Sequence, residues 1–120
     1  MVMKEERRKW PRILTEHLVA YKRLDERAVP DEAGVARTLD LSEGGVVLEM
    51  IHPLEVGCCL EIKMVSGDRI LKARARVVHS QELPAKRWRV GVCFTEISDD
   101  DLAIIAREVE ERRAAGDEGS

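Results

Sequence analysis

The sequence is poor in aromatic residues: Trp10, Tyr21, Trp88 and Phe94 are the only four in 120 residues. A chain of this length has room for one domain with a small core. Because the aromatic residues are so few, that core must consist mainly of valine, leucine and isoleucine. The same shortage argues against a β-barrel that binds single-stranded RNA or DNA, since such barrels stack bases on exposed aromatic side chains.

The sequence also lacks paired cysteines, long apolar runs and an excess of positive charge. Its three cysteines are an odd number, and Cys58 and Cys59 are adjacent, which predicts reduced thiols in a cytoplasmic protein. No apolar run approaches the roughly 20 residues that cross a bilayer, and residues 1–12 contain no hydrophobic signal core. We therefore expect neither membrane insertion nor export. The net charge of −3 does not suit a partner of nucleic-acid polymers.

Short segments with alternating apolar and polar residues predict an antiparallel β-structure. In the first of these segments, residues 13–23, apolar residues occur at both odd and even positions. The side of this segment that faces the core is therefore ambiguous. Residues 24–34 contain Pro30, Asp31 and Gly34 and predict a polar loop. Turn signals between the segments favour a closed or nearly closed barrel, which hides strand edges. The predicted strands are 13–23, 35–41, 46–51, 58–65, 70–80 and 88–94.

The hydrophobic period changes near the C-terminus. Ser98 is a predicted helix N-cap, and the three aspartates after it place negative charge where it favours the helix dipole. An apolar stripe at helical spacing follows, formed by Leu102, Ile105, Ala106 and Val109. We expect a flexible basic N-terminal arm over residues 1–12, a barrel with its helix over 13–113, and a frayed tail over 114–120.

Two short polar segments carry groups that suit a guanine nucleotide. The first holds the arginine pair Arg8 and Arg12 in the basic arm. Arginine presents a planar fork of donors that matches phosphate oxygens and the O6/N7 edge of guanine. The second is the sequence DLSEGG from Asp40 to Gly45. Its carboxylate can accept from guanine N1 and N2, its Ser42 hydroxyl can reach a phosphate, and glycine lets backbone come close. The alternative without a ligand is a solvated basic arm for the first segment and an ordinary tight turn for the second.

These motifs, R-x-x-x-R followed by D-x-S-x-x-G, resemble those of the PilZ domain family, bacterial receptors for cyclic di-GMP. The ending RVGVCF at residues 89–94 looks like the last strand of that family. The resemblance runs from about Arg7 to about Arg113. It implies an all-β fold, a six-stranded antiparallel PilZ-type β-barrel with a C-terminal α-helix. It also implies a single-domain, non-enzymatic receptor that relays the second messenger to an effector protein in motility, exopolysaccharide or biofilm control.

By the same resemblance, the ligand bridges the arm and the barrel, and the arm becomes ordered on binding. Guanidinium groups or a tryptophan ring could also stack on a purine, although core packing is the alternative for Trp88 and partial exposure for Trp10. Arg7 could add a donor fork and Gly44 a backbone hinge. The expected ligand-binding residues are Arg8, Arg12, Asp40, Ser42 and Gly45, with Arg7, Gly44, Arg37, Trp88 and Arg89 as secondary candidates.

Other functions have less support in the sequence. A nucleotide-independent PilZ-like adaptor, such as those of pilus assembly, would tend to lack the arginine pair. A zinc site is not expected, because the spacing of His52, Cys58, Cys59 and His79 matches no structural zinc pattern. The sequence shows neither a nucleophile with a nearby base nor a pair of carboxylates that would indicate catalysis. We expect no cofactor besides the ligand cyclic di-GMP, and a monomer or weak dimer.

Overall fold

The computed structural model describes residues 13–14 and 17–114. Within these ranges the chain forms strands joined by turns and loops, followed by one α-helix. The short 3-10 helix η1 (Pro84–Lys86) joins the last two strands. The strands are β1 (Ile13–Leu14), β2 (Leu18–Leu24), β3 (Pro30–Ser42), β4 (Gly45–Met50), β5 (Cys59–Ser66), β6 (Arg69–Leu83) and β7 (Arg87–Ile97), and the helix is α2 (Asp99–Ala114).

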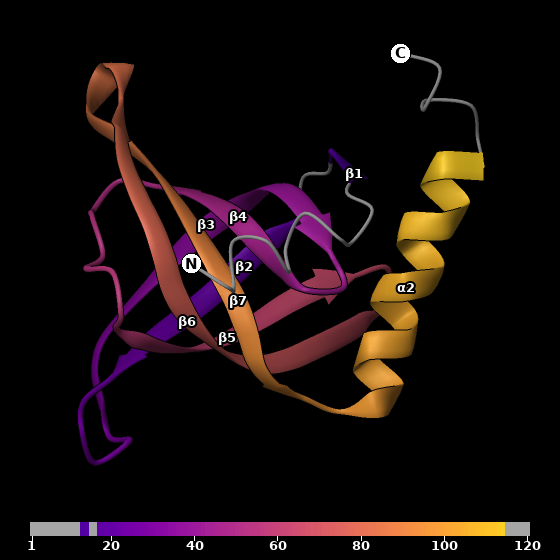
Figure 1. Ribbon diagram of the computed structural model, residues 1–120, viewed down its shortest axis with the longest axis horizontal. Helices are drawn as coiled ribbons and strands as arrows, with labels where there is room; N and C mark the ends of the chain where they lie inside the picture. The colour runs from indigo at the N-terminus through magenta and orange to yellow at the C-terminus, as the bar shows by residue number, and fades with distance from the viewer. Residues whose placement is uncertain (1–12, 15–16, 115–120) are drawn as a thin grey trace.

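Six of these strands close into an antiparallel barrel (Figure 1). The order around the barrel is β3-β2-β5-β6-β7-β4, and pairing of β4 with β3 completes the ring. The two-residue strand β1 pairs with the end of β3, beyond the stretch of β3 that β2 occupies. The six-stranded barrel with a C-terminal helix that the sequence predicted is therefore confirmed. The single strand predicted over 13–23 is wrong in detail, since β1 and β2 are separate strands.

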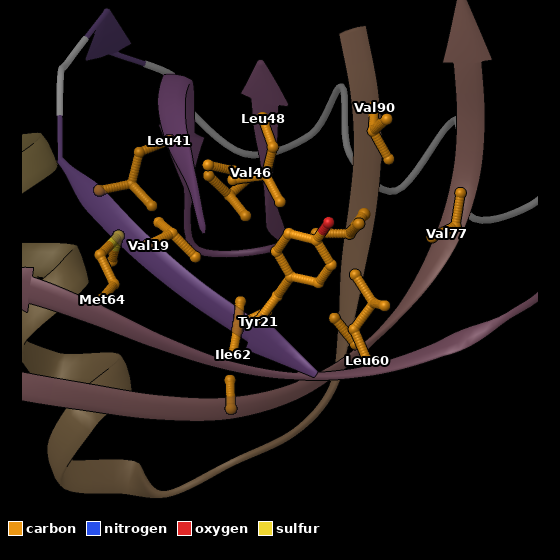
Figure 2. Close-up of a cluster of buried hydrophobic side chains, with 14 of the residues drawn as sticks. Val19, Tyr21, Leu41, Val46, Leu48, Leu60, Ile62, Met64, Val77 and Val90 are labelled. Carbon is orange, nitrogen blue, oxygen red and sulfur yellow. The ribbon is translucent and has the colours of Figure 1, made fainter. Parts of the chain in front are cut away.

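Aliphatic side chains fill the interior of the barrel, with Tyr21 among them (Figure 2). Val19 and Tyr21 are buried, whereas Leu18, Ala20 and Lys22 are exposed. This alternation resolves the ambiguous first segment, because successive side chains of a strand point to opposite faces. As expected from the scarcity of aromatic residues, the core consists mainly of aliphatic residues, which include Leu41, Val46, Leu48, Leu60, Ile62, Met64, Val77 and Val90.

The loop predicted over residues 24–34 is wrong, because β3 already begins at Pro30. Residues 30–37 pair with β2 from Leu24 to Leu18, so a neighbouring strand supplies hydrogen bonds that local composition does not reveal. Proline is tolerated at the first residue of a strand. The strands β6 and β7 likewise extend past their predicted ends at residues 80 and 94.

Helix α2 begins as the sequence predicted. The backbone N–H of Asp101 donates to the Ser98 hydroxyl at 3.0 Å, which confirms the N-cap. The predicted apolar stripe faces the barrel, since Ile105 and Val109 are buried in the core cluster. No helix in the part of the chain that the structure describes is long and apolar enough to span a bilayer.

A polar contact anchors α2 to the barrel. His17 Nε2 lies 2.6 Å from one oxygen of the Glu108 carboxylate, and the Ser66 hydroxyl donates to the other at 3.1 Å. The carboxylate is thus held between the residue before β2 and the end of β5. This contact joins the helix to two strands that are far apart in the sequence.

The assigned core predicts the effect of truncating Leu60, which has no exposed surface. Leu60→Ala should lower the free energy of unfolding by about 2–5 kcal/mol, because a cavity replaces packed methyl groups. Chemical denaturation followed by circular dichroism measures this change. Ile51→Ala is the matched control: Ile51 is 61% exposed, so its truncation should change stability by less than about 0.5 kcal/mol. Equal losses in the two variants would contradict this core.

Candidate ligand-binding site

The D-x-S-x-x-G motif forms the hairpin between β3 and β4. Ser42 pairs with Gly45 across a two-residue turn, so the turn is shorter than the sequence predicted and Asp40 belongs to β3. Asp40 pairs with Leu14 of β1 on one side and with Val47 of β4 on the other. The motif therefore lies where three strands meet.

The Ser42 hydroxyl is used by the turn itself. It accepts from the Gly44 backbone N–H at 3.2 Å and donates to the Gly45 carbonyl at 3.4 Å, and Ser42 is 1% exposed. These are the hydrogen bonds of a side chain that stabilises a tight turn. In this arrangement the hydroxyl serves the hairpin, while its predicted contact with a ligand stays a prediction.

The two glycines of the motif fix the hairpin onto β7. A Cβ atom on Gly45 would lie 2.1 Å from the carbonyl oxygen of Val92, so only glycine fits this approach. The Gly44 carbonyl accepts from the Phe94 backbone N–H at 3.0 Å. The close packing expected of Gly45 thus exists, and its partner is the backbone of β7.

Asp40 lies on the outer face of the barrel wall. Its neighbours in the pairing, Leu41 and Val46, point into the core. Because side chains alternate along a strand, Asp40 and Val47 belong to the opposite face. Asp40 is 8% exposed, so this carboxylate is largely shielded from water, which strengthens its interaction with any cation beside it.

A charged cluster lies on the same outer face. Arg37 donates to the Glu49 carboxylate through Nη2 at 2.7 Å and Nε at 3.0 Å, and Arg87 Nη1 lies 3.6 Å from its other oxygen. Arg89 is directly opposite Glu49 in the pairing of β4 with β7. Of the secondary candidates, the structure therefore brings Arg37 and Arg89 to the same face as Asp40. The sequence did not single out Glu49, although it is the one acidic residue in the apolar segment 46–51.

Trp88 lies on the other face of the wall. It pairs with Met50, which is 2% exposed, and it packs against the core cluster. The structure thus places Trp88 with the core, which was the alternative to stacking on a purine, and separates it from Arg37 and Arg89.

The arginine pair of the N-terminal arm lies outside the described residues, as do Arg7 and Trp10. The chain that follows the arm is described, and Ile13 pairs with Leu41 in β3. Ile13 is covalently bonded to Arg12. The predicted R-x-x-x-R segment therefore leads directly into β1, which pairs with the strand that carries the D-x-S-x-x-G motif.

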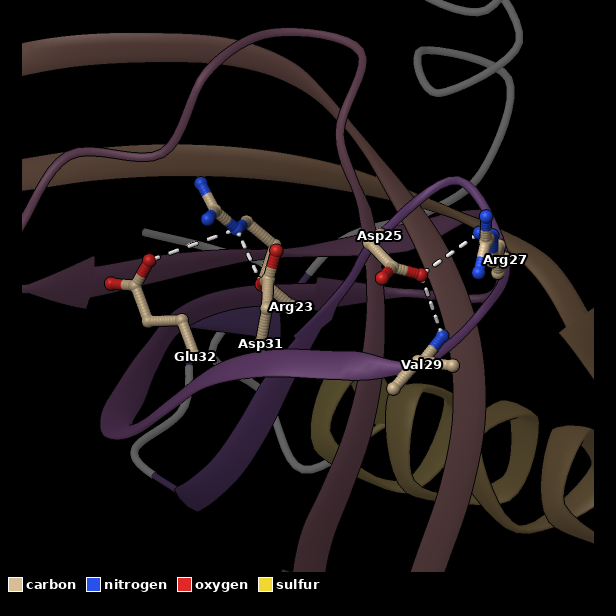
Figure 3. A network of polar contacts seen from close by, with 6 residues as sticks. All are labelled: Arg23, Asp25, Arg27, Val29, Asp31 and Glu32. Atoms are coloured by element: carbon tan, nitrogen blue, oxygen red, sulfur yellow. Dashed lines mark hydrogen bonds and ion pairs between the residues drawn. The ribbon is translucent and has the colours of Figure 1, made fainter.

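An open groove of 660 Å³ lies elsewhere, between the β2–β3 loop and the residues before β5. Arg23 in its wall is held by Asp31 at 2.9 Å and faces Glu32 at 3.7 Å, and the Asp25 carboxylate accepts from two backbone N–H groups of its own loop (Figure 3). Several carboxylates line this groove, so it does not suit a ligand with phosphates. None of its lining residues comes from the motif.

Cys58 and Cys59 also line this groove as free thiols. Burial raises the pKa of the Cys58 thiol, while the nearby Arg23 lowers it. Among the described residues, no group of three or more histidine, cysteine, aspartate or glutamate side chains is arranged to hold a metal ion.

A closed antiparallel barrel with a helix after its last strand, and a D-x-S-x-x-G hairpin docked on that strand, defines a PilZ-type barrel. The sequence pattern of the PilZ domain matches residues 6–111, and the chain belongs to this family.

Solved structures share the fold at low sequence identity. The inhibitor of motility MotI/DgrA from Bacillus subtilis has a TM-score of 0.78 at 15% identity, over 91% of this chain and 52% of that one. The PilZ domain of YcgR from Escherichia coli, solved with c-di-GMP, has a TM-score of 0.69 at 18% identity, over 94% and 97%. The K. pneumonia MrkH–c-di-GMP complex has a TM-score of 0.70 at 13% identity, over 93% and 54%.

This chain thus spans about half the length of the MotI and MrkH chains. No curated protein sequence is significantly similar to it.

The approach of Gly45 to β7 predicts that a methyl group there is destabilising. Gly45→Ala should lower the free energy of unfolding by about 1–3 kcal/mol, because β4 and β7 must separate locally. Thermal and urea denaturation measure the loss. Gly67→Asn is the control: Gly67 has open space around it and a φ of +63°, which asparagine tolerates, so its effect should stay below about 1 kcal/mol. A neutral Gly45→Ala would show that the hairpin is not tightly docked.

The raised pKa of Cys58 predicts slow alkylation. Since the thiolate is the nucleophile, iodoacetamide at about pH 8 should modify Cys58 more slowly in the folded protein than in urea. Mass spectrometry of a Cys59→Ser/Cys93→Ser variant isolates this thiol. Adding Arg23→Gln should slow the folded protein further, because Arg23 favours the thiolate. Faster reaction in the folded state would refute the effect of burial.

Proposed function

We propose that this protein is a non-enzymatic receptor for cyclic di-GMP. One observation carries the proposal: Ile13, the residue after Arg12, pairs with the β3 strand that holds Asp40 and Ser42. The residue that follows the first motif is thereby paired with the strand that carries the second motif, which supports a site formed by both. Arginine forks on the arm and a shielded carboxylate on the barrel supply the donors and acceptors of a guanine nucleotide.

The charged cluster on the outer face supports this placement. Glu49 of β4 lies between Arg37 of β3, the strand that also carries Asp40, and Arg89 of β7. Cations on the barrel wall favour a ligand with two phosphates, and Glu49 holds at least one guanidinium plane in position. We assign the primary contacts to Arg8, Arg12 and Asp40, and secondary contacts to Arg37 and Arg89.

A receptor of this kind acts through another molecule, and we propose an effector protein as the recipient of the signal. Motility, exopolysaccharide synthesis and biofilm formation are the processes that the family suggests. The named structures support this direction, since one is an inhibitor of motility and two contain c-di-GMP. Three free cysteines fit a site of action in the cytoplasm.

A nucleotide-independent adaptor is the second candidate, and one observation favours it. Ser42 and Gly45 already have structural roles, in the turn and in the approach to β7. Two of the three defining residues of the D-x-S-x-x-G motif are therefore explained without a ligand. The charged half of the site, Arg8, Arg12 and Asp40, is the part that separates the two proposals.

Calorimetric titration with cyclic di-GMP tests the proposal. Saturable binding should weaken by about one to two orders of magnitude in Arg8→Ala, Arg12→Ala and Asp40→Asn, because each removes charge-assisted hydrogen bonds of about 1.5–3 kcal/mol. The affinity should also fall as salt is raised. GTP and cyclic di-AMP serve as ligand controls.

Arg27→Ala is the matched protein control, since Arg27 is an exposed arginine in the β2–β3 loop, away from the motif. It should bind like the parent protein, and circular dichroism should show all variants folded. Parent-like affinity in both Arg8→Ala and Arg12→Ala would exclude the proposed site. A folded parent protein that takes up no cyclic di-GMP would favour the adaptor.

A further inference from the structure

Four large aliphatic side chains face solvent on the outer wall of the barrel. Leu18, Val35 and Ile70 are each 61% exposed, and Val65 is 44% exposed. Outward positions of an antiparallel sheet that faces water are ordinarily polar, so a group of aliphatic side chains there indicates a use. These four residues are called the aliphatic patch below.

The pairing of the strands makes one row of this patch continuous. Val65 pairs directly with Ile70 across the β5–β6 hairpin. Val19 pairs with Met64, and the same register brings Leu18 next to Val65. Side chains on directly opposed residues contact one another, so the row runs over β2, β5 and β6.

A second row runs parallel to the first and ends in two lysines. Val35 pairs with Ala20, Ala20 with Lys63, and Lys63 with Lys72. Each of these four residues is exposed. The aliphatic surface of β3 and β2 thus continues directly into a pair of ammonium groups on β5 and β6.

The Lys63–Lys72 pair is electrostatically unfavourable by itself. Like charges directly opposite on neighbouring strands destabilise a sheet. Within residues 17–114, neither ammonium group forms an ion pair with a carboxylate. The Asp101 carboxylate reaches only the backbone N–H of Lys72, at 3.1 Å. A bound carboxylate would relieve this repulsion.

The patch lies apart from the motif hairpin. It occupies β3, β2, β5 and β6, whereas the hairpin joins β3 to β4 and docks on β7. Figure 1 shows α2 at one end of the barrel, and the exposed fractions of the patch are those with α2 in place. A partner on the patch would therefore leave the hairpin accessible, although the β2 end of the patch borders Arg37, which pairs with Leu18.

We infer that the aliphatic patch and the Lys63–Lys72 pair together dock a protein whose contact surface carries aliphatic side chains beside carboxylates. Burial of the patch supplies affinity, and carboxylates opposite the lysines supply orientation. The inference deepens the relay in the proposed function and rests on it for the role of the partner in signalling. The contact itself requires no nucleotide.

Two other occupants fit the surface less well. In a symmetric contact with a second copy, each patch meets another patch of the same composition, so the Lys63–Lys72 pair would find no carboxylate supplied by the patch. A lipid surface is ordinarily held by tryptophan or tyrosine at the interface, and the patch contains neither. A protein with carboxylates beside its apolar surface meets both requirements.

The first test is an NMR titration of the full chain with a synthetic amphipathic peptide of about 16 residues, with leucines on one helical face and glutamates beside them. We expect saturable shifts of the methyl signals of Leu18, Val35, Val65 and Ile70. The Lys63→Glu/Lys72→Glu variant should bind at least about tenfold more weakly. It should regain binding to a second peptide in which lysines replace the glutamates.

Matched variants separate docking from general charge attraction. Arg27→Glu/Lys86→Glu makes the same change in net charge at exposed loop positions and should bind the acidic peptide like the parent protein. Equal weakening in this control would overturn the inference.

The apolar component has its own comparison. Leu18→Ser/Ile70→Ser should abolish binding, while Val29→Ser/Val56→Ser, at positions 51% and 64% exposed elsewhere on the surface, should not. Because all four side chains are exposed, these variants should fold normally. Cyclic di-GMP titration of Ile70→Ser alone tests the nucleotide proposal independently, because Ile70 pairs with Val65 and not with a candidate ligand residue.

Three further results would overturn the inference. One is the absence of saturable shifts with the acidic peptide, and another is a set of shifts confined to β4 and β7. The third is a different occupant: phosphatidylglycerol vesicles that bind at the patch without the peptide binding, or a sedimenting dimer that Leu18→Ser/Ile70→Ser dissociates. Peptide binding in a protein that takes up no nucleotide would support the docking surface and reject only the receptor proposal.

Discussion

Closure of the barrel at β4 is the constraint on which the rest of the structure depends. This strand pairs with β3 along one edge and with β7 along the other. Its first residue, Gly45, approaches the carbonyl of Val92 so closely that no side chain fits. Without β4, both β3 and β7 would present open edges, which are prone to pair with other chains. The hairpin that begins β4 is also the candidate site, so closure and site share the same residues.

This sharing divides the D-x-S-x-x-G motif into two parts. Ser42 and Gly45 hold the hairpin together and onto β7. Asp40 faces outward beside β1, where the chain arrives from the basic arm. A substitution in the first part is therefore expected to change stability, whereas a charge change at Asp40 tests the proposed ligand contact more directly. In the proposed receptor, the hairpin would position the charge of Asp40 and the arm would complete the site, so that no deep pocket is needed.

Much of the fold was predictable from local patterns. The alternation from Cys58 to Val65, the Ser98 cap and the helical stripe each depend on residues close in the sequence, and the structure confirms them. The failures are nonlocal. The polar residues 30–34 form a strand because β2 pairs with them, and no feature of their own composition reveals that partner. The ends of β6 and β7 were likewise decided by pairing with each other.

The sequence by itself determined the class of fold and the residue types of the candidate site, because periodicity, capping and turn chemistry act over a few residues. Only the tertiary structure decided which groups face each other. It placed Arg37 and Arg89 on one face with Glu49 between them, and turned Trp88 toward the core. It also collected Leu18, Val65 and Ile70 into one exposed row. Strand register sets these neighbours, and register depends on the closed ring as a whole.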